Sequence, residues 1–214
     1  MYTAPMEMDN EIELIISSSN DNLIFDLAGC EINGIEDESI EIISIDVKEY
    51  NYESDTKRDV AYIELQLFDE QLSDRDLLII ADECSQDVTN SMSAYIDSKF
   101  RREYEALNIN EMYQSSFSGV LHTFYVVPEY RNRGLFSSII NNMADILYKN
   151  RRYILHHLMA YPRPFSIQTG SDIPSDREYD DSNIVMKEHM TNQLIKNEFV
   201  AINDSNYYIR EYFM

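Results

Sequence analysis

The segment "VVPEYRNRGLF" (126–136) combines residue types that could bind an anion. A β-branched run ends at a proline, a basic loop with one glycine follows, and an apolar helical pattern then begins. The first amides of a helix have no intrahelical acceptor, and the helix dipole is positive at that end. Gly134 permits a close backbone approach or a positive φ, and Arg131 and Arg133 carry forked donors suited to phosphate. The pattern therefore indicates an anion-binding turn. A plain strand-to-helix turn with two solvated arginines is the equal alternative.

The residue spacing gives little support for a nucleotide-binding loop, a metal site or a cysteine nucleophile. Neither a GxxxxGK[ST] phosphate loop nor a GxGxxG dinucleotide loop is present. His156 and His157 are adjacent on an expected strand, so we expect their side chains on opposite faces, unable to share a metal. The acidic run 176–181 lacks calcium-loop spacing, which leaves a solvated loop or one that attracts a cationic amine. Acidic neighbours raise the pKa of a thiol, which argues against Cys84 as a nucleophile. We therefore expect no metal.

The composition is strongly acidic. Among 214 residues, 39 acidic and 17 basic side chains give a net charge of -22. Such a surface repels phosphate backbones, so we expect no nucleic-acid partner. It attracts cationic amines or basic proteins, although solubility alone is the plainer explanation. No apolar run is long enough to span a membrane, no signal-peptide pattern begins the chain, and Cys30 and Cys84 form no CxxC pair. We expect a cytoplasmic protein with free thiols and no membrane partner.

The first 70 residues show the apolar–polar alternation of β-strands. We expect strands at 11–18 and 22–29, and then a long hairpin of strands 39–50 and 59–68 around a polar link.

Residues 73–107 have helical spacing instead. Ser73 or Asp74 could cap a helix, and we expect one long helix or two helices broken near Ser85. A short strand at 77–81 is the competing interpretation.

The rest of the chain alternates strands and helices. The expected elements are a buried strand at 117–127, a helix at 135–149, a strand at 152–161, a polar loop at 162–183, a helix at 184–197 and a closing hairpin over 198–213. No internal repeat interrupts this order.

The segment 126–136 resembles the pyrophosphate-binding segment of the GNAT superfamily of N-acetyltransferases. That family's pattern is Arg or Gln, two residues, Gly, one residue, then Gly or Ala, after a strand that ends in a Val-x-Pro-like turn. Arg131 and Gly134 match its first two fixed positions, and 127–130 matches the lead-in. Phe136 stands where the second small residue is usual. The helix 135–149 and the strand that follows it keep the family's order.

The resemblance implies a single α/β (α+β) domain over 1–214, with a mixed, mainly antiparallel sheet flanked by helices. Residues 1–35 would be accessory strands, 73–107 a helical insert, and 117–214 the best-matching core. It also implies acetyl-coenzyme A as co-substrate, bound where the strands 117–127 and 152–161 splay apart. The implied binding residues are Val126 and Val127 for the pantetheine arm, and the backbone of Arg131, Asn132, Arg133, Gly134, Leu135 and Phe136 for the pyrophosphate.

The resemblance does not supply catalytic residues. The family's general-acid Tyr position falls on Leu194, which cannot donate a proton, and 118–127 contains no acid. His122 could serve as a base, although packing in the sheet is the favoured interpretation. We expect an N-acyltransferase acting on a primary amine of a small-molecule or protein acceptor, cationic in character. The alternatives are a catalytically weakened GNAT-like protein that binds a basic partner and, less favoured, a Cys84-based enzyme.

Overall fold

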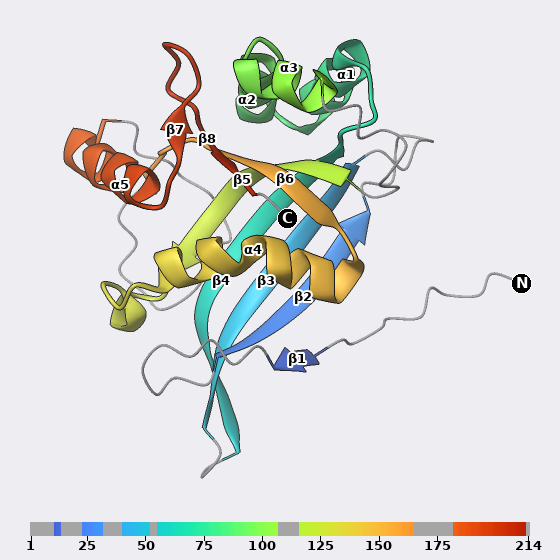
Figure 1. The fold of residues 1–214 in the computed structure, drawn as a ribbon. Coiled ribbons are helices and arrows are strands. Elements are labelled where there is room, and N and C mark those ends of the chain that lie inside the picture. Colours follow the sequence, from blue (N-terminus) through green and yellow to red (C-terminus); the bar gives the residue numbers. More distant parts are fainter. Residues whose placement is uncertain are drawn as a thin grey trace, which may run out of the picture.

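The computed structural model describes residues 11–13, 23–31, 40–51, 55–106, 116–164 and 182–212. Its strands form one sheet in the order β1-β2-β3-β4-β5-β6-β8-β7 (Figure 1). Among the described pairs, only β5 and β6 are parallel. The strands are β1 (Glu11–Glu13), β2 (Leu23–Glu31), β3 (Ile40–Asn51), β4 (Thr56–Asp69), β5 (Ser116–Val126), β6 (Ile154–Ala160), β7 (Val200–Ala201) and β8 (Tyr208–Glu211). The expected mixed, mainly antiparallel α/β architecture is confirmed.

Helices cover both faces of this sheet (Figure 1). They are α1 (Asp74–Cys84), α2 (Gln86–Ile96), α3 (Lys99–Ala106), α4 (Leu135–Arg151) and α5 (Ile184–Lys196). Leu67 belongs to the apolar core beneath α4, whereas its neighbour Phe68 belongs to the core beneath α1 to α3. Successive residues of a strand point to opposite faces, so α4 and the insert lie on opposite sides of the sheet.

The expected hairpin is confirmed and is longer than its apolar pattern. β3 and β4 pair from Ile40 opposite Phe68 to Asn51 opposite Thr56. The strands extend into the polar link because main-chain hydrogen bonds need no apolar side chain. β2 begins one residue later and ends two residues later than expected, and β1 covers only the first three residues of 11–18. The remainder of 11–18 lies outside the described residues.

The insert forms three helices, so the expectation of one or two was wrong, and so was the competing strand at 77–81. Ser73 caps α1 by accepting a hydrogen bond from the Asp76 amide at 3.2 Å. Ser85 ends α1 and caps α2 through the Val88 amide, which confirms the break expected there. A third serine, Ser98, accepts from the Arg101 amide at the start of α3. Serine side chains compete with helix continuation in this way, and each break lets the insert turn back over the sheet.

The C-terminal elements follow the expected order. α4 runs two residues beyond 149, to Arg151, and its C-cap Arg152 has a left-handed φ of 63°. β6 is shorter than expected by two residues at its start and one at its end, and α5 ends one residue earlier than expected. Most of the expected loop, 165–181, lies outside the described residues.

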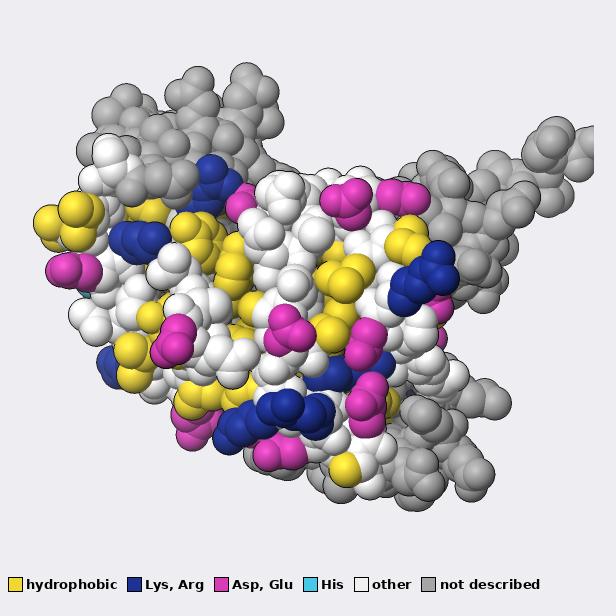
Figure 2. All heavy atoms as spheres, turned by 90° about the horizontal axis from the view of Figure 1, so that it is seen from above, with side chains coloured by type: hydrophobic (Ala, Val, Ile, Leu, Met, Phe, Trp, Pro, Cys, Tyr) yellow, Lys and Arg dark blue, Asp and Glu magenta, His cyan; other side chains and the backbone are white. Residues whose placement is uncertain are grey.

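α5 packs lightly against the rest of the chain. Among its residues only Leu194 is buried. Hydrophobic side chains are visible at the end of the molecule where α5 lies (Figure 2). The exposed large hydrophobic residues of this region are Ile184, Val185, Met186, Ile195 and Val200.

Candidate functional site

The parallel strands β5 and β6 separate before β5 ends. Their pairing runs from Ser116 opposite Ile154 to Leu121 opposite Ala160, whereas β5 continues to Val126. Over these last residues β5 keeps its pairing with β4, up to Ala61 opposite Val126. One edge of β5 is therefore left without a paired strand within the described part of the chain.

Val126 presents its backbone to that edge. The Val127 amide donates to the Val60 carbonyl at 2.9 Å, which makes Val126 and Ala61 a pair that shares no main-chain hydrogen bonds. The N–H and C=O of Val126 therefore point away from β4, toward the side that β6 has left. Val127 differs from Val126 because its amide already donates to a carbonyl of β4 and is not available to a ligand.

The turn after β5 leads into a helix end without a side-chain cap. Pro128–Tyr130 form one 3₁₀ turn, and Asn132 and Gly134 take left-handed φ values of 62° and 79°. Gly134 is the N-cap of α4 and has no side chain to accept from the first amides. A Cβ atom placed on Gly134 would meet nothing within 4 Å, so the space beside this turn is open. The first turn of α4 contains no acidic residue, which leaves it suited to an anion.

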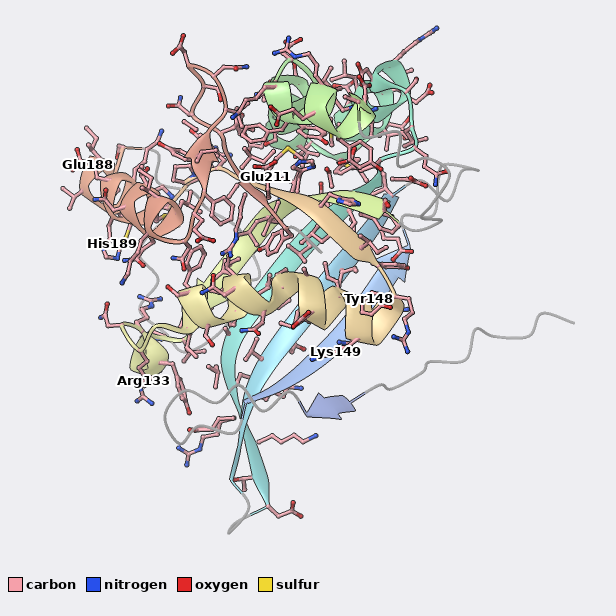
Figure 3. The ribbon with its side chains drawn as sticks, in the orientation of Figure 1. Arg133, Tyr148, Lys149, Glu188, His189 and Glu211 are labelled. Atoms are coloured by element: carbon pink, nitrogen blue, oxygen red, sulfur yellow. The ribbon has the colours of Figure 1, made fainter. Side chains whose placement is uncertain are left out.

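The two arginines of the turn have different roles. Arg131 donates from Nε to the Val126 carbonyl at 2.9 Å, and its guanidinium lies 5.6 Å from the centre of the Tyr125 ring. Arg133, at the lower left of Figure 3, is exposed. Its guanidinium carbon lies 4.8 Å from the ring centre of Tyr130. Arg131 therefore occupies the open edge of β5, whereas Arg133 is available to a ligand at the turn.

Phe136 is directed into the interior. Its half-buried ring meets Phe124 of β5 edge to face, with 4.8 Å between ring centres, at the border of the core beneath α4. The bulky residue at the family's small position therefore packs against the sheet.

A bulge places His122 where β5 leaves β6. Glu64 of β4 pairs with Thr123, but Leu65 pairs with Leu121, so His122 is the extra residue. Its Nε2 lies 3.8 Å from a carboxylate oxygen of Glu64, with side-chain exposures of 17% and 10%. Tyr62 donates to the other oxygen of Glu64 at 3.1 Å.

Sequence reasoning sought an acid only within 118–127 and missed Glu64. The available signal was Glu64, the one carboxylate within the alternating segment "VAYIELQLF" (60–68). Only the pairing of β4 with β5 shows that this carboxylate lies beside His122.

A second polar cluster is buried between the insert and the sheet. Glu70 is 3% exposed and accepts from Arg101 at 2.7 Å, from Tyr95 at 2.6 Å and from the Ser118 hydroxyl. Nδ1 of His157 lies 3.3 Å from the same carboxylate. The cluster joins the end of β4 to α2, α3, β5 and β6, so it fixes the insert against the parallel pair.

The two histidines of β6 do not alternate as expected. Phe117 pairs with Leu155 but Ser118 pairs with His157, so His156 is the extra residue of a bulge. Both rings meet Tyr104, with ring centres at 5.2 Å and 6.3 Å, and lie 6.4 Å from each other. The expectation of opposite faces was wrong because it assumed an unbroken strand. No metal-holding group of three or more His, Cys, Asp or Glu was found among the described residues.

The charge state of Glu70 couples this cluster to pH. Burial would raise the pKa of Glu70, but the hydrogen bond and charge of His157 and the hydroxyls of Ser118 and Tyr95 lower it below 4.5 overall. Such a carboxylate stabilises the fold above its unfolded pKa, and this contribution is lost as pH falls through the folded pKa.

We expect Glu70→Gln to lower the free energy of unfolding by about 1–3 kcal/mol near neutral pH. The difference from the wild type should shrink below about pH 4 in urea unfolding. A constant difference between neutral and acid pH would contradict this assignment.

The other candidate residues lie away from the open edge. Leu194 is 5% exposed and belongs to the core beneath α4, so it only packs there. Cys84 is half-buried, and burial together with Glu83 raises the pKa of its thiol, which disfavours a nucleophilic thiolate.

No protein-family model and no curated protein matches this chain. Among the described residues, no helix is both long and apolar enough to cross a membrane. The geometry of the open edge, the turn and the bulge must therefore support any functional assignment.

Proposed function

We propose that this protein is an acetyl-coenzyme A-dependent N-acyltransferase of the GNAT type, acting on a primary amine. The observation that carries the proposal is the early separation of β5 from β6, directly followed by the uncapped start of α4. The amide-containing pantetheine arm of the co-substrate could bind along the open edge of β5 as an added strand does. Its pyrophosphate could then bind at the N-terminal end of α4. The fold resemblance adds an analogy to this argument and does not replace it.

The residues at this site are compatible with acetyl-coenzyme A. Val126 offers one donor and one acceptor for the pantetheine arm, and Arg131 would have to release the Val126 carbonyl. The open space beside Gly134 allows a phosphate to approach the amides of α4. Arg133 adds an exposed cation on the same turn. The role expected for Val127 is not supported by its main chain, because its amide donates to the Val60 carbonyl and its own carbonyl accepts from the Tyr130 amide at 2.9 Å.

His122 is the candidate base in this proposal. A protonated amine must lose one proton before its nitrogen forms a bond to the acetyl carbon. The carbon–sulfur bond then breaks, and the thiolate takes up the second proton of the amine through solvent. His122 lies at the point where the strands separate, and Glu64 lies beside its ring. A neighbouring carboxylate stabilises the imidazolium that proton transfer would form.

Binding of acetyl-coenzyme A tests the proposal directly. At about 100 times its Kd, a native-state ligand adds about 2.7 kcal/mol of stability. For a chain of this size, that raises Tm by about 5–10 °C in a thermal-shift measurement. We expect Arg133→Ala to reduce the shift and Lys149→Ala to leave it unchanged. Both side chains are exposed, but Lys149 lies at the far end of α4 (Figure 3). No shift with acetyl-coenzyme A or free coenzyme A would refute the proposal.

The second candidate is a GNAT-like binding protein without turnover. It is favoured by the hydrogen bond from Arg131, which takes the carbonyl that the co-substrate would need, and by Leu194 at the family's Tyr position. Its expected basic partner would be drawn by the net charge of -22. In the view from above, however, acidic and basic side chains are interspersed rather than gathered into one acidic patch (Figure 2). A missing thermal shift together with salt-sensitive binding of a basic protein would support this candidate.

A further inference from the structure

We propose that the sheet face opposite α4 binds a primary ammonium group through Glu64, Gln66 and Thr123. As an assignment of the acceptor substrate, this inference rests on the proposed function. As an assignment of a binding site, it rests only on the polar atoms of β4 and β5.

The first observation is a pair of buried acceptors that are not satisfied. Gln66 Oε1 and Thr123 Oγ1 are buried and have no hydrogen-bond partner within the described structure. Both residues are 5% exposed. Buried polar side-chain atoms in folded proteins nearly always have a partner. Two orphaned oxygens therefore indicate a donor that the described residues do not supply, such as a bound ligand.

The second observation is that the two oxygens share one face with a carboxylate. Glu64 lies directly opposite Thr123 in the register, and Gln66 follows two residues later on the same strand. Side chains at these positions lie on the same face and close to one another. The opposite face carries Leu65 and the core beneath α4. The carboxylate and the two orphaned oxygens therefore form one polar strip.

The chemistry of the strip selects the ligand. A primary ammonium group has three N–H donors and no acceptor, and the strip offers Glu64, Gln66 Oε1 and Thr123 Oγ1 as three acceptors. Glu64 also supplies the negative charge, and its side chain is 10% exposed, so its attraction to a cation is weakly screened by water. The same carboxylate disfavours an anionic ligand.

The position of the strip fits an acceptor for the proposed reaction. His122 borders it, 3.8 Å from Glu64, and stands at the first residue of β5 beyond the pairing with β6. An ammonium group held by Glu64 would therefore lie beside the candidate base and next to the open edge of β5.

Titration of butylamine at about 150 mM salt, where long-range surface attraction is screened, tests the site by calorimetry. We expect saturable binding of one butylammonium per chain and no binding of tetramethylammonium, which has no N–H donor. Glu64→Gln and Thr123→Val should each weaken binding about tenfold, as expected for one charge-assisted or buried hydrogen bond. Glu188→Gln is the matched control, because it removes the same charge from an exposed position on α5 (Figure 3).

Thr123→Val also tests the site in the absence of ligand, through its effect on the free energy of unfolding. Removing an unsatisfied buried hydroxyl should leave the stability of the free chain unchanged or raised, as measured by urea unfolding. Loss of stability would show that the hydroxyl already has a partner, and this would overturn the inference. Equal binding of tetramethylammonium, or equal weakening by Glu188→Gln, would also overturn it, because surface charge alone would then account for binding.

Two further probes distinguish the source of the amine. Tighter binding of spermidine than of Nα-acetyl-lysine amide supports the site with a free polyamine as ligand, and the reverse order supports it with a protein lysine as ligand. If amine binding fails while the acetyl-coenzyme A shift persists, this inference fails and the proposed function stands. If the shift is absent while amine binding persists, only the proposed function fails.

Discussion

Replacing Arg101 by alanine should lower the free energy of unfolding by about 3–5 kcal/mol, because it removes the arginine partner of the buried Glu70 carboxylate. The Arg101 side chain is 5% exposed, and that of Glu70 is 1% exposed. Arg101 also donates to the Glu70 and Leu72 carbonyls at 3.1 Å and 2.8 Å, so the truncation orphans main-chain acceptors as well. For a chain of this length, the loss corresponds to a fall in Tm of roughly 6–20 °C. Urea unfolding would measure it.

The neighbouring arginine provides the control. Arg102 is exposed on the same helix, so Arg102→Ala should change stability by no more than about 0.5 kcal/mol. Replacing both members of the buried pair by apolar residues, as in Glu70→Leu with Arg101→Met, should recover most of the loss. Similar losses for Arg101→Ala and Arg102→Ala would show that the Glu70 cluster does not hold the insert against the sheet.

Under the proposed function, replacing Gly134 by valine should weaken acetyl-coenzyme A binding about 100-fold, equivalent to about 2.7 kcal/mol. Gly134 has a φ of 79°, a region that is strongly unfavourable for a β-branched side chain. The backbone would have to move, which would re-aim the first amides of α4 away from a pyrophosphate. Calorimetry at a temperature where the variant is folded separates this effect from lost stability.

The matched control for Gly134→Val is Asn132→Gly in the same turn. Asn132 also has a left-handed φ, of 62°, which glycine adopts without steric cost. We expect this variant to bind acetyl-coenzyme A with nearly the wild-type Kd. If Gly134→Val bound equally well, the start of α4 would not be the pyrophosphate site.

Local patterns were sufficient to predict most of the elements. The alternation of 39–50 and 59–68 predicted the hairpin, and the apolar spacing of 135–149 predicted α4. Ser73 and Ser85 were predicted at helix boundaries because a capping hydrogen bond joins residues only three positions apart. The break at Ser98 was missed, because apolar residues before and after it, such as Ile96 and Phe100, continue the helical spacing across it.

Bulges limited what could be predicted within strands. The expectation for His156 and His157 used the strict period of two, and one extra residue in β6 was enough to bring both rings to Tyr104. The same effect at His122 brought it beside Glu64. A bulge depends on how two strands pair, so the sequence of one strand does not reveal it.

The sequence by itself determined the order of the elements, the basic turn with its glycine, and the acidic balance of the chain, because these follow from composition and from neighbours within a few residues. Only the tertiary structure decided where β5 parts from β6, which carboxylate lies beside His122, and that Glu70, Tyr95, Arg101, Ser118 and His157 form one buried cluster. The members of that cluster are separated by up to 87 positions in the chain. Such contacts form only when the cooperative fold repays the entropy of closing long loops, and no local period of the sequence carries that information.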